Sequence, residues 1–265
     1  MLARMTIRGI DYFSGERADF AAFRAAGLSF ACRYISTPGN DKNLTPHEVA
    51  GLHANGLSIV VVFERTQLRS LEGAAGGTED GGLAREQAGV LGCPGTVPIY
   101  AAVDFDAQPK DMPTVLAYLR AFEAAVAPHP LGVYGGFRVI DTVHKAHGWR
   151  VPGPFLWQAG AWSKQGRHPA AHLHQNGGDH VGGVDVDTDR ATGPGYGGWA
   201  PPGGVLARLD ADDLAAIAGL VRNALDEGTG HGQHDWGSTS KAILGTVQAN
   251  HNDLADVRHA LREHT

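Results

Sequence analysis

Short β-rich runs of the chain alternate with stretches whose apolar residues recur at helical spacing. Eight such runs lie at 6–11, 28–36, 57–64, 97–106, 131–136, 154–160, 171–176 and 181–187. Helical patterns separate the early runs and lie at 17–26, 46–55, 82–91, 112–127 and 137–147. A strand–helix–strand rhythm of this kind is typical of parallel β/α units.

The number and spacing of these runs predict the fold class. Eight strands within about 190 residues, with full helices only in the first five units, predict an α/β protein: a TIM-type (β/α)8-like barrel with degenerate helices in its second half. An open, doubly wound sheet is the alternative, but that fold needs a phosphate-binding Gly-x-Gly-x-x-Gly after the first strand. The residues there read GIDYFSGER, so the barrel is favoured.

The composition changes after the glycine- and proline-rich segment 193–204. We therefore place a boundary near residue 203, with the barrel over 1–203 and a helical tail over 204–265. In the tail the sequence predicts a helix at 210–227, a Gly/His-rich linker at 228–240 and a last helix at 241–264.

Charge and composition narrow the class of function. The net charge of −6 argues against nucleic acid as a partner, because phosphate backbones attract basic surfaces. No run of about 18 apolar residues is present, so no membrane span is predicted, and the first residues lack the apolar stretch of a signal peptide. The two cysteines, Cys32 and Cys93, are expected to be free thiols.

Four of the eight predicted strands carry acidic residues at their C-terminal ends: Asp11, Glu64, Asp104 with Asp106, and Asp185 with Asp187. In a β/α barrel these ends face the active-site mouth. Any single acid could be a solvated loop residue or a helix N-cap, but acids on four strands together indicate a cluster. Such a cluster serves acid/base chemistry on an acetal or the binding of a divalent metal.

The pair Asp104 and Asp106 is two residues apart, so both side chains would point to the same side of a strand. When two carboxylates lie so close together, the pKa of one of them is raised, and that group becomes a proton donor near neutral pH. Aromatic residues accompany the acids and suit the apolar faces of sugars: Tyr12, Tyr134, Trp157 and Trp162. Trp157 lies in an apolar run and fits a core position equally well.

Histidine and glycine are abundant without forming a known motif. His172 and His174 alternate on one strand, yet no His-Glu-x-x-His or comparable spacing is present, so no metal and no other cofactor is predicted. The glycine-rich stretch 72–82 lacks the Gly-Lys-Ser/Thr of a phosphate loop. It is expected to be a long flexible segment at the rim after the third strand and a candidate lid.

Short motifs occur in a characteristic order: GIDYFSG in the first strand, DFD after IYAAV in the fourth, VYGG in the fifth, LWQAGAW in the sixth, and HQN followed by GGVDVDTD at the end. In order and spacing they resemble the glycoside hydrolase family 25 lysozymes over residues 6–192. The closer resemblance is to the bacterial glycoside-hydrolase-like domain of actinobacterial surface proteins and phage lysins. It implies a TIM-type barrel with shortened helices in its second half, and a peptidoglycan-like polysaccharide as ligand.

Two positions depart from the lysozyme pattern. The lysozymes carry Asp-x-Glu after strand four, with the Glu as proton donor, and here that position is Asp106. Their Trp-Gln-Tyr strand is here His174, Gln175 and Asn176. The glycoside-hydrolase-like relatives carry a Glu on strand three, which Glu64 matches, so the resemblance implies Glu64 as a substitute acid.

The leading interpretation is a muramidase-like glycoside hydrolase that acts on cell-wall glycan, delivered by lysis, a phage particle or a secretion system. Asp106 or Glu64 would be the general acid, while Asp104 and Asp11 would stabilise the oxocarbenium-like charge or orient water; a 2-acetamido group of the substrate could supply the nucleophile. Glycan contacts are expected from Tyr12, Arg33, Tyr134, Trp157, Gln158, Gln175, Asp185 and Asp187. The alternatives are a non-catalytic glycan-binding module and a structural component of a phage tail or secreted assembly.

The last predicted helix carries an apolar seam with alternating spacings of four and three residues: Ile243, Val247, Asn250, Leu254, Val257 and Leu261. This is the a/d pattern of a coiled coil with one polar member; the alternative is an amphipathic helix folded back on the barrel. We expect a small homo-oligomer held by the tail. Deleting 240–265 should lower the mass in solution to that of a monomer by light scattering. A full-length chain that is already monomeric would contradict this expectation.

Overall fold

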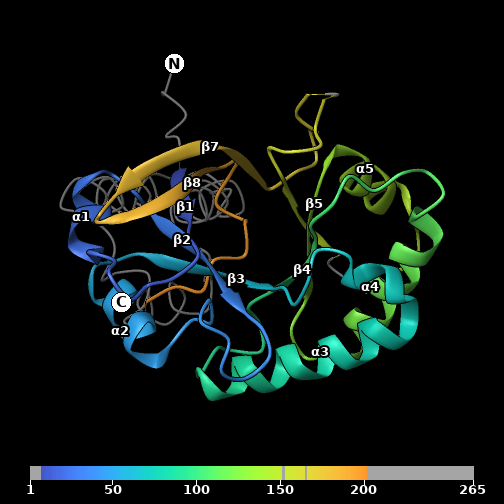
Figure 1. Cartoon of the computed structure of the whole chain (residues 1–265), viewed down its shortest axis with the longest axis horizontal. Helices are drawn as coiled ribbons and strands as arrows, with labels where there is room; N and C mark the ends of the chain where they lie inside the picture. The colour runs from blue at the N-terminus through green and yellow to red at the C-terminus, as the bar shows by residue number, and fades with distance from the viewer. Residues whose placement is uncertain (1–6, 151–152, 165, 202–265) are drawn as a thin grey trace, which may run out of the picture. The chain divides into compact units, whose positions relative to one another are not determined.

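The computed structural model describes residues 7–150, 153–164 and 166–201. In these residues eight strands close into one barrel in chain order, with β8 beside β1 (Figure 1). The strands are β1 Ile7–Asp11, β2 Phe30–Ile35, β3 Ser58–Phe63, β4 Ile99–Val103, β5 Leu131–Gly135, β6 Phe155–Gln158, β7 Leu173–Val181 and β8 Val184–Ala191. The predicted TIM-like α/β barrel is confirmed.

Helices follow each of the first five strands, as the sequence predicts. The described helices are α1 Phe20–Ala25, α2 Pro46–Ala54, the 3-10 helix η1 Arg69–Glu72, α3 Gly73–Val90, α4 Met112–Val126 and α5 Phe137–Lys145. Helix α1 begins later than predicted because the Asp19 carboxylate caps it, accepting a hydrogen bond from Ala22 N at 3.0 Å. Helix α2 begins as predicted, with Thr45 as its cap and Pro46 in the first position.

The last strand runs against its neighbours, which the hydrophobic pattern does not reveal. Strands β1 to β7 pair in parallel, whereas β8 is antiparallel to both β7 and β1. β7 and β8 form a hairpin that turns at Gly182 and Gly183, where two separate parallel strands were expected. Asp185 and Asp187 therefore lie in the N-terminal half of β8, and their predicted place at the C-terminal end of a parallel strand is wrong.

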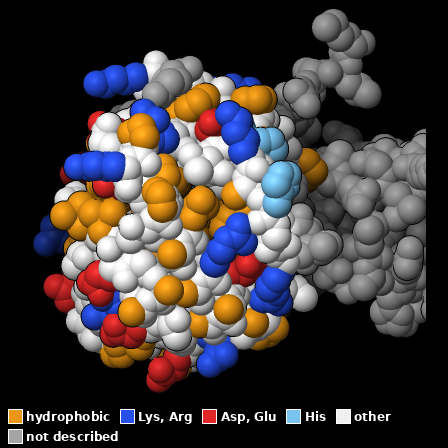
Figure 2. All heavy atoms as spheres, turned by 90° about the vertical axis from the view of Figure 1, so that its right-hand side faces the viewer, with side chains coloured by type: hydrophobic (Ala, Val, Ile, Leu, Met, Phe, Trp, Pro, Cys, Tyr) orange, Lys and Arg blue, Asp and Glu red, His pale blue; other side chains and the backbone are white. Residues whose placement is uncertain are grey.

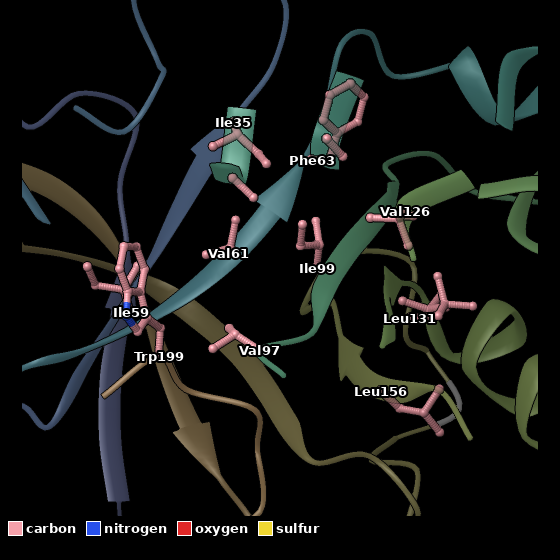
Figure 3. Packing of buried hydrophobic residues seen from close by; sticks show 14 of the residues in the cluster. Ile35, Ile59, Val61, Phe63, Val97, Ile99, Val126, Leu131, Leu156 and Trp199 are labelled. Atoms are coloured by element: carbon pink, nitrogen blue, oxygen red, sulfur yellow. The ribbon is translucent and has the colours of Figure 1, made fainter. Parts of the chain in front are cut away.

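Alternation along the strands sorts their side chains between two apolar layers. Residues of one parity fill the barrel interior: Phe30, Cys32, Val60, Val62, Tyr100, Ala102, Trp157, Leu173 and Ala191. Residues of the other parity pack between strands and helices, as Ile35, Val61, Phe63, Ile99 and Leu131 do in Figure 3. The interior parity continues into the polar residues at the C-terminal ends of the parallel strands, and this brings those side chains to one end of the barrel.

The glycine-rich segment 72–82 is helical, so the predicted flexible lid is wrong. The segment spans the end of η1 and the first half of α3, which packs along α4. An ideal Cβ on Gly77 would lie 2.1 Å from the Tyr118 carbonyl oxygen, and one on Gly81 would lie 2.6 Å from the Phe122 carbonyl oxygen. These glycines therefore permit the close approach of two helices instead of loop flexibility.

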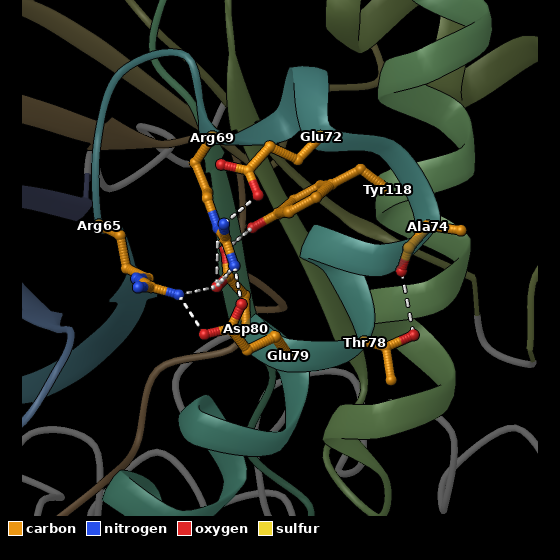
Figure 4. A network of polar contacts seen from close by, with 8 residues as sticks. All are labelled: Arg65, Arg69, Glu72, Ala74, Thr78, Glu79, Asp80 and Tyr118. Atoms are coloured by element: carbon orange, nitrogen blue, oxygen red, sulfur yellow. Dashed lines mark hydrogen bonds and ion pairs between the residues drawn. The ribbon is translucent and has the colours of Figure 1, made fainter.

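A buried carboxylate anchors the same segment. Asp80 of α3 is fully buried and accepts hydrogen bonds from Arg65 Nη1 at 3.2 Å and from Arg69 Nε at 3.0 Å. The Tyr118 hydroxyl of α4 donates a third hydrogen bond at 2.9 Å (Figure 4). The network joins the chain that follows β3 to α3 and α4, so this part of the rim is anchored by buried hydrogen bonds.

Two further sequence-based expectations can be placed. Cys32 and Cys93 are buried free thiols, as predicted. The tail helices and their apolar seam fall in 202–265, outside the described residues.

None of the described helices is long and apolar enough to cross a membrane. The face on the right-hand side of Figure 1 mixes basic, acidic and apolar side chains (Figure 2).

Gly77→Ala is expected to destabilise the protein by about 1–3 kcal/mol, because the added methyl group must displace the backbone of α4. Gly82→Ala is the matched control in the same helix. Nothing lies within 4 Å of its added Cβ, and replacing an open helical glycine should add about 0.5–1 kcal/mol of stability. Urea unfolding followed by circular dichroism measures both changes. Equal effects of the two substitutions would show that close packing is not the reason for Gly77.

Candidate active site

Polar side chains meet at the end of the barrel where the parallel strands finish. They are Asp11 on β1, Tyr34 on β2, Glu64 after β3, Asp104 after β4, Tyr134 on β5, Gln175 on β7 and Asp187 on β8. β8 contributes because it runs the other way, so that its N-terminal half lies at this end with Asp187 opposite Asp11 in register. The pKa of Asp104 responds to both Glu64 and Asp11, so the structure brings these three acids together.

Asp11 is held in a frame of hydrogen bonds. The Tyr34 hydroxyl donates to Asp11 Oδ1 at 3.1 Å, and Gln175 Nε2 donates to Asp11 Oδ2 at 2.9 Å. The Tyr134 hydroxyl orients Gln175 by donating to its Oε1 at 3.1 Å. Burial raises the pKa of Asp11 to about 6, and the donors oppose this shift only in part. Asp11 is therefore a fixed carboxyl group that changes charge in mildly acidic solution.

A second aspartate lies deeper in the barrel, next to Asp11. Asp189 is 3% exposed, and Trp157 Nε1 donates to its Oδ1 at 2.8 Å. Burial, and next the charge of Asp11, raise the pKa of Asp189 well above its ordinary range, so this acid keeps its proton. Asp189 Oδ2 is buried and has no hydrogen-bond partner among the described residues, and the two carboxyl groups influence each other's pKa. Trp157, expected as a glycan contact, is 1% exposed and positions Asp189 instead.

Glu64 and Asp104 form the other half of the mouth. Lys42, from the loop between β2 and α2, places its Nζ 3.3 Å from Glu64 Oε2. Burial, and next the charge of Glu64, raise the pKa of Asp104 to about 6, whereas Lys42 acts in the opposite direction. The mouth therefore holds one carboxylate with a cationic partner beside one carboxyl group that keeps a proton in mildly acidic solution.

Asp106 stands apart from this cluster. Strand β4 ends at Val103, so the alternation of a strand does not extend to Asp106, and the Asp106 side chain is exposed. The charges that shift the pKa of Asp104 come from Glu64, Lys42 and Asp11. The close pair expected along one strand is thus replaced by a pair that spans two neighbouring strands.

Three of the predicted glycan contacts have the opposite parity and serve the barrel wall. The Arg33 guanidinium is fully buried and pairs with Glu48 of α2, and the Tyr12 hydroxyl donates to Glu48 Oε1 at 2.7 Å. Gln158 bonds to the main chain of the loop after β6 through both ends of its amide, each at 2.7 Å. Because side chains on this side of the strands face the helices and loops, Arg33 and Gln158 support the mouth from behind, whereas Tyr12 lines the groove as well.

The alternating histidines also belong to the structural part of the barrel. Leu156 N donates to His172 Nδ1 at 3.0 Å. Burial lowers the pKa of both His172 and His174, so both side chains are neutral near pH 7. Among the residues that the structure describes, no cluster of three or more His, Cys, Asp or Glu side chains suits a metal ion.

A groove of about 640 Å³ runs from the mouth toward the β7–β8 hairpin. Its lining residues are Asp11, Tyr12, Phe13, Tyr34, Gly178, Asp179, His180, Asp185, Val186 and Asp187. Phe13 exposes 63% of its surface. Asp185, whose side chain is 97% exposed, lies 2.8 Å from His180 Nδ1. The groove thus joins the buried Asp11 to an open surface that is both aromatic and acidic.

Three residues of the mouth were not singled out from the sequence. Tyr34 follows Cys32 by two residues in one strand, so the alternation of side chains along a strand could have placed both on the same face of the sheet. Asp189 likewise follows Asp187 by two residues, but the direction of β8 decides where that side chain lies. Lys42 is in a loop, and only the tertiary structure brings it to the mouth.

Residues 21–191 match the sequence profile of the family described as "Rv2525c-like, glycoside hydrolase-like domain". The chain belongs to this family. This glycoside-hydrolase-like protein is 33% identical over 207 residues to the "Putative peptidoglycan hydrolase Rv2525c" of Mycobacterium tuberculosis, a match that covers 72% of this chain and 83% of the relative. The resemblance inferred from the motifs is therefore confirmed.

Solved structures share the barrel of this glycoside-hydrolase-like protein. The crystal structure of the Mycobacterium tuberculosis Tat-secreted protein Rv2525c in complex with L-tartrate matches with a TM-score of 0.65 and 32% identity, over 75% of this chain and 100% of that chain. GHIP, a glycosyl hydrolase 25 of Streptococcus pneumoniae, matches with a TM-score of 0.50 and 14% identity, over 70% of this chain and 87% of that chain. The second likeness is one of fold.

Asp104→Asn should stabilise this protein above pH 7 and have little effect at pH 4. Folding raises the pKa of Asp104 from 3.8 to about 6. The folded state therefore binds more protons between these values, so stability falls as the pH rises through this window and stays lower above it. Because the group is partly exposed, the expected gain in unfolding free energy at pH 7.5 is only about 1 kcal/mol.

Urea unfolding at the two pH values measures this gain. Asp106→Asn is the matched control, since it removes the same charge two residues away at an exposed site. It should change the stability by less than about 0.5 kcal/mol. Equal gains for the two variants at pH 7.5 would contradict the crowding of Asp104.

Proposed function

We propose that this protein is a glycoside hydrolase that cleaves the glycan of bacterial cell walls, with Asp104 as the proton donor. The observation that carries the proposal is the unlike surroundings of two neighbouring acids. Glu64 lies 3.3 Å from the Lys42 ammonium, whereas burial and the charge of Glu64 raise the pKa of Asp104 to about 6. Glycosidases need one carboxyl group that gives a proton and one carboxylate that stays charged.

The family relationship supports the class of substrate. The mycobacterial relative carries the name of a peptidoglycan hydrolase, qualified as putative, at 33% identity over most of both chains. A glycan of this kind offers sugar rings with apolar faces and many hydroxyl groups. The groove matches both features, since Phe13 and Tyr34 supply aromatic surface and Asp179 and Asp187 supply acceptors for hydroxyl groups.

Asp104 takes the role that the sequence assigned to Asp106 or Glu64. The Asp106 side chain is exposed, and Asp106 is not among the charges that shift the pKa of Asp104. The Lys42 ammonium lies 3.3 Å from Glu64 Oε2 and holds this side chain at the mouth, where it would stabilise positive charge on the sugar. Asp104 combines partial burial with two acidic neighbours, and this combination produces a proton donor.

The cleavage step follows from these roles. Asp104 would donate its proton to the glycosidic oxygen as the bond from that oxygen to the anomeric carbon breaks. The oxygen of the substrate's own 2-acetamido group would form the new bond to the anomeric carbon, while Glu64 and ionised Asp11 offset the positive charge on the sugar. Water would then attack the anomeric carbon as the bond from that carbon to the acetamido oxygen breaks, and the proton that the water loses would go to Asp104, which restores the acid.

A glycan-binding module without turnover is the second candidate. One observation favours it: Asp106 stands where the lysozyme pattern has its proton-donating Glu. The two candidates differ in products, because a hydrolase releases new reducing ends from cell walls whereas a binding module retains the glycan intact.

Asp104→Asn should lower the turnover of cell walls by about 100- to 10,000-fold, because an amide is far too weak an acid to protonate the glycosidic oxygen while its volume is nearly unchanged. Release of reducing ends, with mass analysis of the products, measures turnover. Asp106→Asn is the control and should keep activity within a few-fold of the parent. Loss of activity in Asp106→Asn alone would move the proton donor to Asp106. If the parent has no turnover, the hydrolase proposal fails and the glycan-binding module takes its place.

A further inference from the structure

We propose that Lys42 is a positioning residue of the mouth: its ammonium holds the Glu64 carboxylate in place and counters the negative charge around Asp104. The catalytic consequence of this role rests on the proposed function. The electrostatic role rests on the geometry of the mouth, so the two can fail separately.

The ammonium of Lys42 lies inside the cluster instead of at its solvent edge. The Lys42 side chain is 9% exposed, and its Nζ lies 3.3 Å from Glu64 Oε2. The same Nζ lies 5.2 Å from the centre of the Tyr34 ring, within range of a cation–π contact. Tyr34 in turn donates to Asp11 Oδ1 at 3.1 Å. A buried ammonium is stable only with partners of this kind, so its place is determined by the mouth itself.

The backbone of Lys42 is fixed from behind. Arg33 Nη2 donates to the Lys42 carbonyl oxygen at 3.2 Å, and Lys42 N donates to Asn40 Oδ1 at 3.1 Å. Arg33 is itself fully buried in an ion pair with Glu48 of α2. The lysine therefore reaches the mouth from an anchored loop, which reduces the number of positions that its long side chain can take.

Asp104 is surrounded by titratable groups from every neighbouring element. Glu64 after β3 and Asp11 on β1 both raise the pKa of Asp104, and Tyr134 on β5 interacts electrostatically with it. Lys42 is the cationic member of this set and lowers the pKa of Asp104. Because a nearby positive charge favours a carboxylate, removal of the ammonium would leave Asp104 protonated up to a higher pH.

This role has a consequence for the pH range of catalysis. A general acid must be protonated at the start of the reaction, so activity falls as the pH rises through its pKa. Lys42 would set the upper limit of that range. It would also keep Glu64 where the positive charge develops, without touching the substrate.

The test follows the carboxyl carbon of Asp104 through a pH titration by NMR in the full chain. The parent should titrate at about 6. Lys42→Met, which keeps the aliphatic stem, should move the midpoint to higher pH, and Lys42→Arg should restore it. Lys145→Met is the matched control, since Lys145 pairs with Asp141 of α5 and its side chain is 71% exposed. An unchanged midpoint in Lys42→Met, or an equal shift in Lys145→Met, would overturn the proposal.

Glu64→Gln provides a second variant that leaves the lysine in place. It removes a charge that raises the pKa of Asp104, so the midpoint should move to lower pH, opposite to Lys42→Met. The midpoints of the two variants should shift in opposite directions even when Lys42→Met lowers the melting temperature. A midpoint that does not fall in Glu64→Gln would also contradict the arrangement, and it serves as the deciding measurement if Lys42→Met does not fold.

Cell-wall turnover then tests the catalytic consequence. Lys42→Met should lower kcat by about 10- to 100-fold with little change in KM, because a misplaced Glu64 affects the reacting state. Its activity should fall off at a higher pH than that of the parent, and Lys42→Arg should recover most of the loss. A parent without turnover would refute the proposed function, while the titration would still decide the role of Lys42. A parent-like pH profile in Lys42→Met would refute the catalytic part.

Discussion

The antiparallel pairing of β8 with both of its neighbours is the constraint on which the mouth depends. It closes the barrel and fixes a register in which Asp187 is opposite Asp11 and Asp189 is opposite Gly9. One strand thereby delivers acids at two depths, one at the rim and one in the interior. A parallel β8 would carry the same residues toward the mouth in the reverse order. The partners of Asp11 therefore follow from the direction of a single strand.

Crowded acids of this kind oppose folding, and three different interactions in the barrel reduce their repulsion. Hydroxyl and amide donors from Tyr34 and Gln175 surround Asp11. A retained proton removes the charge of Asp189. An ammonium offsets Glu64. Asp104 has none of these at hydrogen-bonding distance in the described structure, so it carries the remaining unfavourable charge. Residual repulsion at one group is typical of sites where activity is maintained against stability.

The sequence is sufficient for the barrel and for part of the mouth. The rhythm of strands and helices identifies the fold, and acids at strand ends identify Asp11, Glu64 and Asp104 as neighbours. The pattern fails where side-chain direction depends on where a strand stops, as at Asp106, or on which way it runs, as at Asp185. The pattern also fails at Gly77, because the local sequence does not distinguish a glycine that permits close helix packing from a glycine in a flexible loop. Lys42 has no local signal at all, since its role depends on contacts that the loop makes across the barrel rim.

The ion pair between Arg33 and Glu48 joins the outside of the barrel to its mouth. Glu48 lies in the first turn of α2 and has no place in the groove, yet it holds the guanidinium that anchors the Lys42 carbonyl. In a library of random variants, substitutions of Glu48 would therefore lower activity as substitutions at the mouth do. The size of that loss would depend on which residue stands at position 33. The contacts that fix the mouth thus extend through the barrel wall into α2, a helix that contributes no lining residue to the groove.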